Sequence, residues 1–181
     1  LLADHPVLSV NGNVAALVPA EMVDLAEAVD ADIEINLFNR TEERMEAIAD
    51  HLREHGAESI KGLTADGRIP NLSHERAKVD ADGIGAADVV LVPLEDGDRA
   101  EALGAMGKTE IVIDLNPLSR SAQVAAIPIV DNIMRAVPNM TAHARELQGA
   151  DRETLAEIVD AFDPEAALAA AEAAIREGEL Q

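Results

Sequence analysis

The chain has 181 residues, of which 48% are hydrophobic, so it is large enough and apolar enough to form one domain with a sizeable core. Its 35 acidic and 14 basic residues give a formal net charge of −21, which disfavours nucleic acid and anionic membranes as partners. The sequence contains no cysteine, which excludes a disulfide framework and a thiolate nucleophile. It also contains no apolar stretch near the ~20 residues that a membrane-spanning helix requires. A soluble, cytoplasmic protein is the default expectation.

Two compositional biases accompany the acidic excess. Lysine occurs at three positions, and Phe38 and Phe162 are the aromatic residues. Molar salt shortens the Debye length to ~3 Å, so the self-repulsion of so acidic a chain becomes tolerable there. The composition therefore predicts a halophilic origin, with an ordinary acidic protein as the alternative.

Short apolar runs alternate with helical patterns in the first third of the chain. A run at 6–10 predicts a buried strand, and apolar residues at helical spacing follow it as far as Val29. A second run at 33–38 predicts another strand, after which Thr41 is placed to cap a helix. A weak strand is expected near 59–61.

The remaining two thirds begin without regular patterning. Residues 62–85 contain Gly, Pro, Asn and Asp without sustained periodicity, which predicts a long surface excursion. Apolar runs then predict strands at 87–93, 111–114 and 127–130, with helices after the first and the last. From about residue 149 the chain is acidic and alanine-rich, which predicts two helices packed on the edge of the core.

Near-continuous Val, Ile and Leu strands separated by helices are typical of a parallel sheet covered on both faces. The predicted fold class is α/β, a Rossmann-like parallel sheet with helices on both faces and a helical C-terminal tail. We place the core at 1–147 and the tail at 148–181. Ligands of such sheets bind beyond the carboxyl ends of the strands, so polar residues at the strand exits are the candidates for a site.

Two polar motifs follow predicted strands. Asn11, Gly12 and Asn13 stand between a strand and a helix, where free N–H groups and the helix dipole attract an anion, although the triplet also fits a plain turn. The run EDGDR at 95–99 groups three carboxylates and an arginine around a glycine. Its carboxylates could bind Mg²⁺ or an amine, and its arginine a phosphate. The alternative is a solvated acidic turn without a ligand.

The most suggestive motif is DLNPLSRS, which begins at Asp114. This residue ends an apolar strand, where an unpaired carboxylate is costly. Asn116 offers hydrogen bonds, and Arg120 is the natural partner for a phosphate. Asp and Asn recur together at 131–132, after the next strand. Two neighbouring exits of this kind favour a nucleotide-binding edge, although Asp and Asn also begin ordinary turns.

Two other patterns are weaker. Arg40 follows the second strand, where NADP enzymes hold the 2′-phosphate, but the first strand lacks the glycine fingerprint. The simpler interpretation of this stretch is a helix N-cap with an exposed arginine beside it. His51 and His55 match an H-x-x-E-H zinc pattern, yet they lie at the polar end of a helix, where solvated histidines are expected. No metal site is therefore predicted.

Five segments carry a family resemblance. They are HPVLSVNGNVAALVP (5–19), EINLFNRTEER (34–44), ADVVLVPLEDGDR (87–99), IDLNPLSRSA (113–122) and IVDNIMRAVPNM (129–140). Together they resemble the archaeal 4-phosphopantoate–β-alanine ligase family, also called phosphopantothenate synthetase. The motifs are long, ordered and correctly spaced over roughly residues 1–147, and the alanine-rich tail carries none of them.

The resemblance implies a Rossmann-like homodimer that joins 4-phosphopantoate to β-alanine in coenzyme A biosynthesis. ATP, with Mg²⁺, would be converted to AMP and pyrophosphate through an acyl-adenylate. Carried over by position, the family's ATP contacts fall on Asp114, Leu115, Asn116, Arg120, Ser121, Asn132 and Ile133. The ribose is assigned to Asp114 or Asn116 and the phosphates to Arg120. The pantoate phosphate or the amine would face Asn11, Gly12, Asn13, Asp96, Asp98 and Arg99.

Two alternatives remain open beside the ligase: an NADP-dependent reductase on a Rossmann-like sheet, and a non-catalytic nucleotide-binding module. The resemblance also implies some tens of residues before the first strand, with arginines that contact ATP. Nothing in this sequence corresponds to them, and the chain opens with Leu1 rather than methionine. We therefore expect a fragment that lacks the N-terminal segment of the family.

Overall fold

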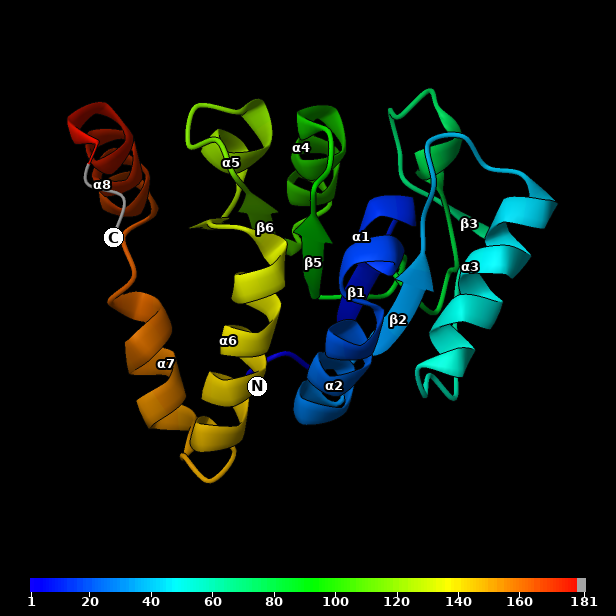
Figure 1. Ribbon diagram of the computed structural model, residues 1–181, viewed down its shortest axis with the longest axis horizontal. Coiled ribbons are helices and arrows are strands. Elements are labelled where there is room, and N and C mark those ends of the chain that lie inside the picture. Colours follow the sequence, from blue (N-terminus) through cyan, green and yellow to red (C-terminus); the bar gives the residue numbers. More distant parts are fainter. Residues whose placement is uncertain (179–181) are drawn as a thin grey trace.

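The computed structural model describes residues 1–178, which form a five-stranded parallel sheet flanked by helices (Figure 1). The strand order is β2-β1-β5-β6-β7, and every pairing within it is parallel. The predicted α/β class and Rossmann-like parallel sheet are confirmed. The strands are β1 (Pro6–Val10), β2 (Asp32–Ile35), β5 (Val89–Pro93), β6 (Thr109–Asp114) and β7 (Ile127–Val130).

One face of the sheet is covered by four helices. Side chains at alternate strand positions, such as Leu8, Leu91 and Ile113, join the apolar faces of these helices in one core cluster. The predicted helical stretch up to Val29 is divided in two, because Pro19 begins a new helix at its first turn. The helices are α1 (Gly12–Leu17), α2 (Pro19–Val29), α3 (Glu42–Glu54) and α6 (Ile133–Leu147).

The opposite face is covered by α4 (Gly97–Ala105), α5 (Arg120–Val124) and the segment 62–86. The prediction that residues 62–85 form a surface excursion is wrong, because Ile69, Val79 and Ile84 are completely buried against this face. These apolar residues are irregularly spaced, so no periodicity announces them. The segment contains β3 (Gly67–Arg68), a 3₁₀ turn η1 (Glu75–Ala77) and β4 (Lys78–Val79).

The second predicted strand is shorter than expected and ends at Ile35. Beyond it, Asn36 is fully buried and its Nδ2 donates to the backbone oxygens of Arg76 (3.2 Å) and Lys78 (3.0 Å). The side chain thereby fixes segment 62–86 instead of prolonging the sheet. The weak strand expected near 59–61 is reduced to a single parallel bridge between Lys61 and Glu34.

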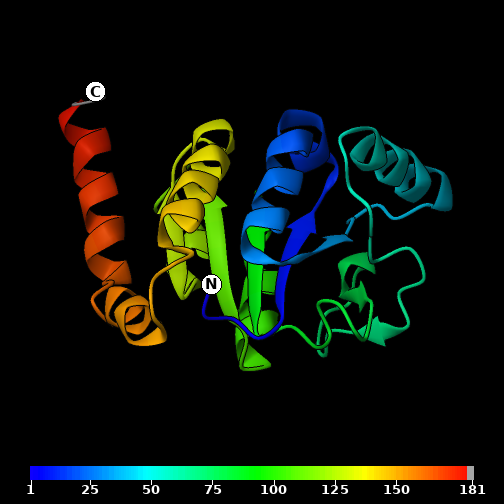
Figure 2. The same cartoon turned by 90° about the horizontal axis from the view of Figure 1, so that it is seen from below.

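The tail forms two helices, as predicted: α7 (Arg152–Asp160) and α8 (Pro164–Glu177). Figure 2 shows both standing at one side of the sheet, where α8 contacts the edge strand β7. Residues 179–181 of the predicted tail lie outside the described part of the chain. Within residues 1–178, no helix combines the length and the apolarity needed to cross a bilayer.

Candidate functional site

The carboxyl ends of β6 and β7 lie side by side in the sheet. Asp114 pairs in register with Val130, so the two strands end at the same level. The Asp114 carboxylate accepts hydrogen bonds from the Asn116 amide (2.9 Å) and from the Ser119 hydroxyl (2.7 Å). The cost expected of a carboxylate at this position is therefore offset by two donors in the loop that follows. Asn116 tightens the same loop by accepting from the Leu118 amide (2.9 Å).

At the neighbouring exit, Asn132 is the N-cap of α6, and its Oδ1 accepts from the Met134 amide (2.9 Å). Ile133 is buried in the core, whereas Leu115 is 61% exposed and Met134 57% exposed. Asp114, Leu115, Asn116, Asn132 and Ile133 thus form one group at the β6 and β7 exits, with polar groups bordered by exposed apolar surface.

Arg120 lies on the other side of this loop, across the start of α4. Its Nε donates to Oε1 of Glu101 (2.7 Å), and its Nη2 pairs with the other oxygen of the same carboxylate. The hydrogen bonds and the charge of Arg120 lower the pKa of Glu101, and Glu101 in turn raises the pKa of Arg120. Gly97 permits this crossing, because a Cβ there would lie 2.6 Å from Cγ of Arg120.

Ser121 connects α5 to the exit of β5. Its hydroxyl is buried and donates to the backbone oxygen of Glu95 (2.6 Å). The Glu95 side chain is the centre of a buried ion cluster with Arg99 (2.5 Å) and Arg76. Burial raises the pKa of Glu95, while the charges of Arg99 and Arg76 act in the opposite direction. Arg99 is fully buried and also donates to Oγ of Ser9 (3.1 Å), so it anchors α4 to β1.

Asp96 and Asp98 flank Gly97 and are each held by a residue of segment 62–86. Arg76 donates to Asp96 Oδ2 at 3.1 Å, and His74 Nε2 lies 3.2 Å from Asp98 Oδ2. Phe38 completes this group, because its ring lies 5.1 Å from the His74 ring and beneath the Arg76 guanidinium. Sequence patterning does not mark His74 and Arg76 as site residues, because they stand in the segment without periodicity. Phe38 stands at the end of a predicted strand, and nothing in the sequence links it to the site.

The triplet after β1 is engaged within the fold. The Asn11 amide donates to the backbone oxygens of Pro93 (3.1 Å) and Leu94 (3.2 Å), and its Oδ1 caps α1 by accepting from the Asn13 and Val14 amides. Asn11 therefore joins the exits of β1 and β5. Gly12 lies against Arg44, since a Cβ on this glycine would be 3.6 Å from Nη2. Asn13 is exposed at the same edge.

The two weaker patterns have local partners. Arg40 uses Nη2 to bind the backbone oxygens of Gly62 and Leu63 (3.2 Å for the latter), so it fastens the start of segment 62–86. His51 and His55 lie at the end of α3, where His55 Nδ1 contacts the backbone oxygen of His51 (2.8 Å). Across residues 1–178, no three His, Asp or Glu side chains are grouped to hold a metal ion.

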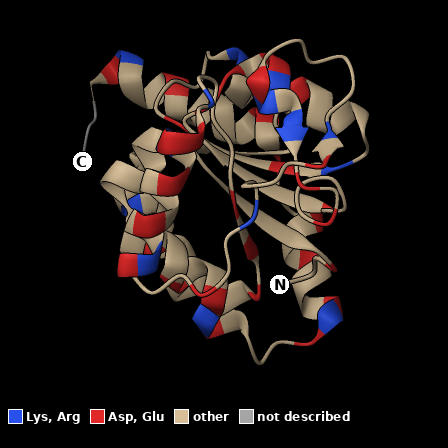
Figure 3. Ribbon diagram, turned by 90° about the vertical axis from the view of Figure 1, so that its right-hand side faces the viewer, with Lys and Arg blue, Asp and Glu red and all other residues tan. Residues whose placement is uncertain are grey.

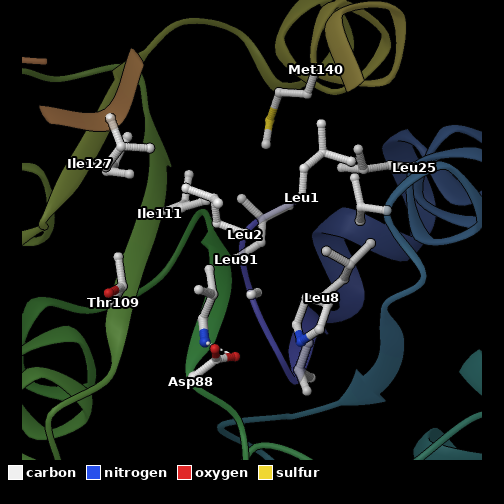
Figure 4. Close-up of a pocket in the computed structure, with 16 residues that line it drawn as sticks. Leu1, Leu2, Leu8, Leu25, Asp88, Leu91, Thr109, Ile111, Ile127 and Met140 are labelled. Carbon is white, nitrogen blue, oxygen red and sulfur yellow. Dashed lines mark hydrogen bonds between the residues drawn. The ribbon is translucent and has the colours of Figure 1, made fainter. Parts of the chain in front are cut away.

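Two hollows differ in character and in place. One, of about 380 Å³, lies between α4, α5 and the turn at 70–73, and both Asp98 and Arg120 line it. The other, of about 290 Å³, is apolar and lies at the opposite, amino end of the sheet between α2 and α6 (Figure 4). Asp88 borders it and accepts from the backbone amides of Asp4 (2.7 Å) and His5 (2.8 Å). The first hollow thus unites two residues predicted for the site.

Acidic residues outnumber basic ones around the candidate site as they do in the whole chain, which has 35 acidic and 14 basic residues. In the ribbon of Figure 3, Asp and Glu positions (red) occur on most helices, and Lys and Arg positions (blue) are interspersed among them. At the site itself, Arg76, Arg99 and Arg120 are all paired with carboxylates. An anionic ligand must therefore be bound by groups that already have internal partners.

The parallel sheet, with polar loops after neighbouring strands, defines a Rossmann-like α/β protein, a class whose ligands bind at the carboxyl edge of the sheet. Comparison with known proteins specifies the family. The chain belongs to the phosphopantothenate/pantothenate synthetase family, whose model matches residues 1–178. The prediction that the likeness ends near residue 147 is therefore wrong, since the match continues through α7 and α8.

Proteins named 4-phosphopantoate–β-alanine ligase are similar to this chain. The one from Thermococcus kodakarensis is 60% identical over 164 residues, which cover 90% of this chain and 63% of that protein. The one from Thermococcus onnurineus is 59% identical over the same shares. The one from Methanosarcina mazei is 49% identical over 177 residues, 98% of this chain and 70% of that protein. The chain thus spans 63% of the length of the two Thermococcus relatives.

Proposed function

We propose that the chain provides the ATP-binding and substrate-binding core of a 4-phosphopantoate–β-alanine ligase. The reaction joins the two substrates to 4′-phosphopantothenate and converts ATP to AMP and pyrophosphate, as a step in coenzyme A biosynthesis. Support comes from the family membership and from relatives of that name that are 49–60% identical. The observation that carries the proposal is the register between Asp114 and Val130, because it brings the Asp114 and Asn132 loops together at one edge.

ATP is assigned to this edge. Exposed Leu115 and Met134 offer apolar contact for the base, and Asp114 or Asn116 accepts hydrogen bonds from the ribose. Arg120 turns towards the start of α4 and is the partner for the phosphates. Ser121 fixes the position of α5 relative to β5 through Glu95. Ser121 and Ile133 are buried, and their proposed role is to hold the loops after β6 and β7 in place rather than to supply charge.

The chemistry proceeds in two displacements. The pantoate carboxylate attacks the α-phosphorus of ATP and pyrophosphate leaves, which gives an acyl-adenylate. The β-alanine ammonium group first loses one proton to solvent; the resulting amine attacks the acyl carbon, AMP leaves with the bonding electron pair, and the nitrogen releases a second proton to give the amide. Neither step needs a covalent bond to the protein, so positioning and charge neutralisation account for the catalysis. The polar loops at the carboxyl edge supply both.

Further assignments accompany this proposal. Mg²⁺ would enter with the ATP phosphates, because it is commonly bound mainly through substrate oxygens, and no three acidic or histidine side chains within residues 1–178 are grouped to hold it by themselves. A homodimer in the cytoplasm, without nucleic-acid or membrane partners, is the proposed working form. Arg40, the residue that suggested an NADP-dependent reductase, is committed to the backbone of segment 62–86.

The test begins with ligand-induced stabilisation of the protein. Mg-ATP at ~100 times its dissociation constant adds about 2.7 kcal/mol to the free energy of unfolding. Phosphopantothenate, AMP and pyrophosphate are then measured after 4-phosphopantoate, β-alanine and ATP are mixed. Stabilisation by NADPH but not by ATP would favour the reductase, and ATP binding without pyrophosphate release would favour a non-catalytic module.

A further inference from the structure

The hollow between α4, α5 and the turn at 70–73 contains opposite charges at one opening. Asp98 and Glu101 come from α4, and Arg120 from the start of α5. The side chains of Asp98 and Glu101 are 43% and 45% exposed, so both carboxylates are open to solvent. Ala102 and Ala105 line the wall of the hollow, and their small side chains leave room for a ligand.

Net charge decides which kind of ligand suits this hollow. Two carboxylates face one guanidinium, and that guanidinium already forms a two-point ion pair with Glu101. The remaining charge is the negative charge of Asp98. A doubly charged phosphate is repelled there, whereas an ammonium group is attracted. Of the two ligand groups that the Asp96 to Arg99 region was predicted to face, the hollow therefore fits the amine.

Asp98 is held in place by two groups that do not line the hollow. Its Oδ2 lies 3.2 Å from His74 Nε2, and its Oδ1 accepts from the Arg99 amide (3.0 Å). Each carboxylate oxygen has a second lone pair, so one further donor is readily accommodated. His74 is itself packed on Phe38, which fixes the imidazole. The orientation of the carboxylate is thus set before any ligand arrives.

We propose that Asp98 binds the ammonium group of the amino-acid acceptor in this hollow, with His74 as its positioning residue. The inference rests on the proposed ligase function, in which the acceptor is β-alanine. Arg120 lines the same hollow, and exchanging its Glu101 partner for an ATP phosphate would bring the activated acid next to the amine, with Asp98 left to the ammonium group. The acceptor and the activated acid thereby meet across Gly97.

The test measures β-alanine directly and in turnover. Asp98→Asn keeps the shape and removes the charge, and we expect at least a tenfold rise in both the dissociation constant and the KM for β-alanine. His74→Ala should raise the KM for β-alanine, while His74→Gln, which retains an N–H donor, should restore it. Asp24→Asn, on α2 across the sheet, is the matched control and should leave both constants unchanged.

Calorimetric titration with β-alanine separates this inference from the ligase proposal, because it needs no turnover. If the wild-type protein forms product and Asp98→Asn leaves the β-alanine KM unchanged, or raises only that for 4-phosphopantoate, the acceptor assignment is overturned and the ligase stands. Propionate, which lacks the ammonium, should bind wild type and Asp98→Asn alike. A loss of propionate binding equal to that of β-alanine would also overturn the role of Asp98.

Discussion

Glu34 is a fully buried carboxyl group on the edge strand β2. Its two oxygens accept from the backbone amides of Asp80 (3.0 Å) and Ile84 (2.6 Å), and it thereby fastens segment 62–86 to the sheet. Burial raises its pKa to about 7, against the effect of these two hydrogen bonds. Gly83 passes so close that a Cβ there would collide with the carboxylate.

The magnitude follows from linkage. The pKa of Glu34 moves from an ordinary value of 4.5 to about 7 on folding, and each unit corresponds to 1.36 kcal/mol, so the effect on the free energy of unfolding is about 3 kcal/mol. The folded chain binds this proton more tightly than the unfolded chain. Its contribution to stability is therefore complete below pH 4.5 and is lost as pH rises to about 7.

Glu34→Gln isolates this contribution, because glutamine has the same shape and does not titrate. Urea unfolding of both proteins at about pH 4, 5, 6, 7 and 8 gives the difference in unfolding free energy, which should shift by about 3 kcal/mol in favour of the variant as pH rises. Glu58→Gln, at an exposed position on the loop after α3, is the control and should show no such trend. A difference that stays constant would mean that the two amides keep Glu34 ionised and that burial is the weaker effect.

Three further predictions concern the site and the acidic surface. Arg120→Ala should raise the ATP dissociation constant at least tenfold without moving the urea midpoint, since the side chain is exposed, and unchanged affinity would refute its phosphate role. Gly97→Ala should also weaken ATP binding, because the new Cβ would lie 2.6 Å from Cγ of Arg120 and displace it; ATP titration checks this, and retained affinity contradicts it. Raising KCl to about 2 M should raise the urea midpoint, because screening relieves the repulsion of the acidic surface, and a flat or falling midpoint would count against a halophilic origin.

The sheet was predictable because burial on both faces leaves a direct trace in sequence. Strands such as β5 read as continuous apolar runs, since one set of side chains meets α2 and α6 while the other meets α4 and segment 62–86. Segment 62–86 was missed for the opposite reason. Its position depends on buried polar groups, above all Glu34 and Asn36, whose partners are backbone atoms some forty to fifty residues away. No local pattern encodes such contacts.

The site was predictable only in part. Residues next to strand ends, such as Asp114 and Asn132, follow from the rule that parallel strands end at a common edge. His74 and Arg76 do not, because they reach this edge through segment 62–86. Sequence position also does not reveal which side chains of a motif are buried. Arg99 stands in the motif with Asp96 and Asp98, yet its side chain lies in the core and pairs with Glu95.

The start of α4 connects these findings. A ligase that forms an acyl-adenylate has to keep a phosphate and an amine close together without letting their partners neutralise each other. Gly97 stands between the residues of the two proposed roles: Arg120 crosses over it, and Asp98 follows it with its carboxylate beside His74. Beneath them, Glu95 is bound through its backbone by Ser121 and through its side chain by Arg76 and Arg99. Because this buried cluster ties α5, α4 and segment 62–86 to one residue, we expect a substitution of Glu95 to disturb the proposed phosphate-binding and amine-binding residues together.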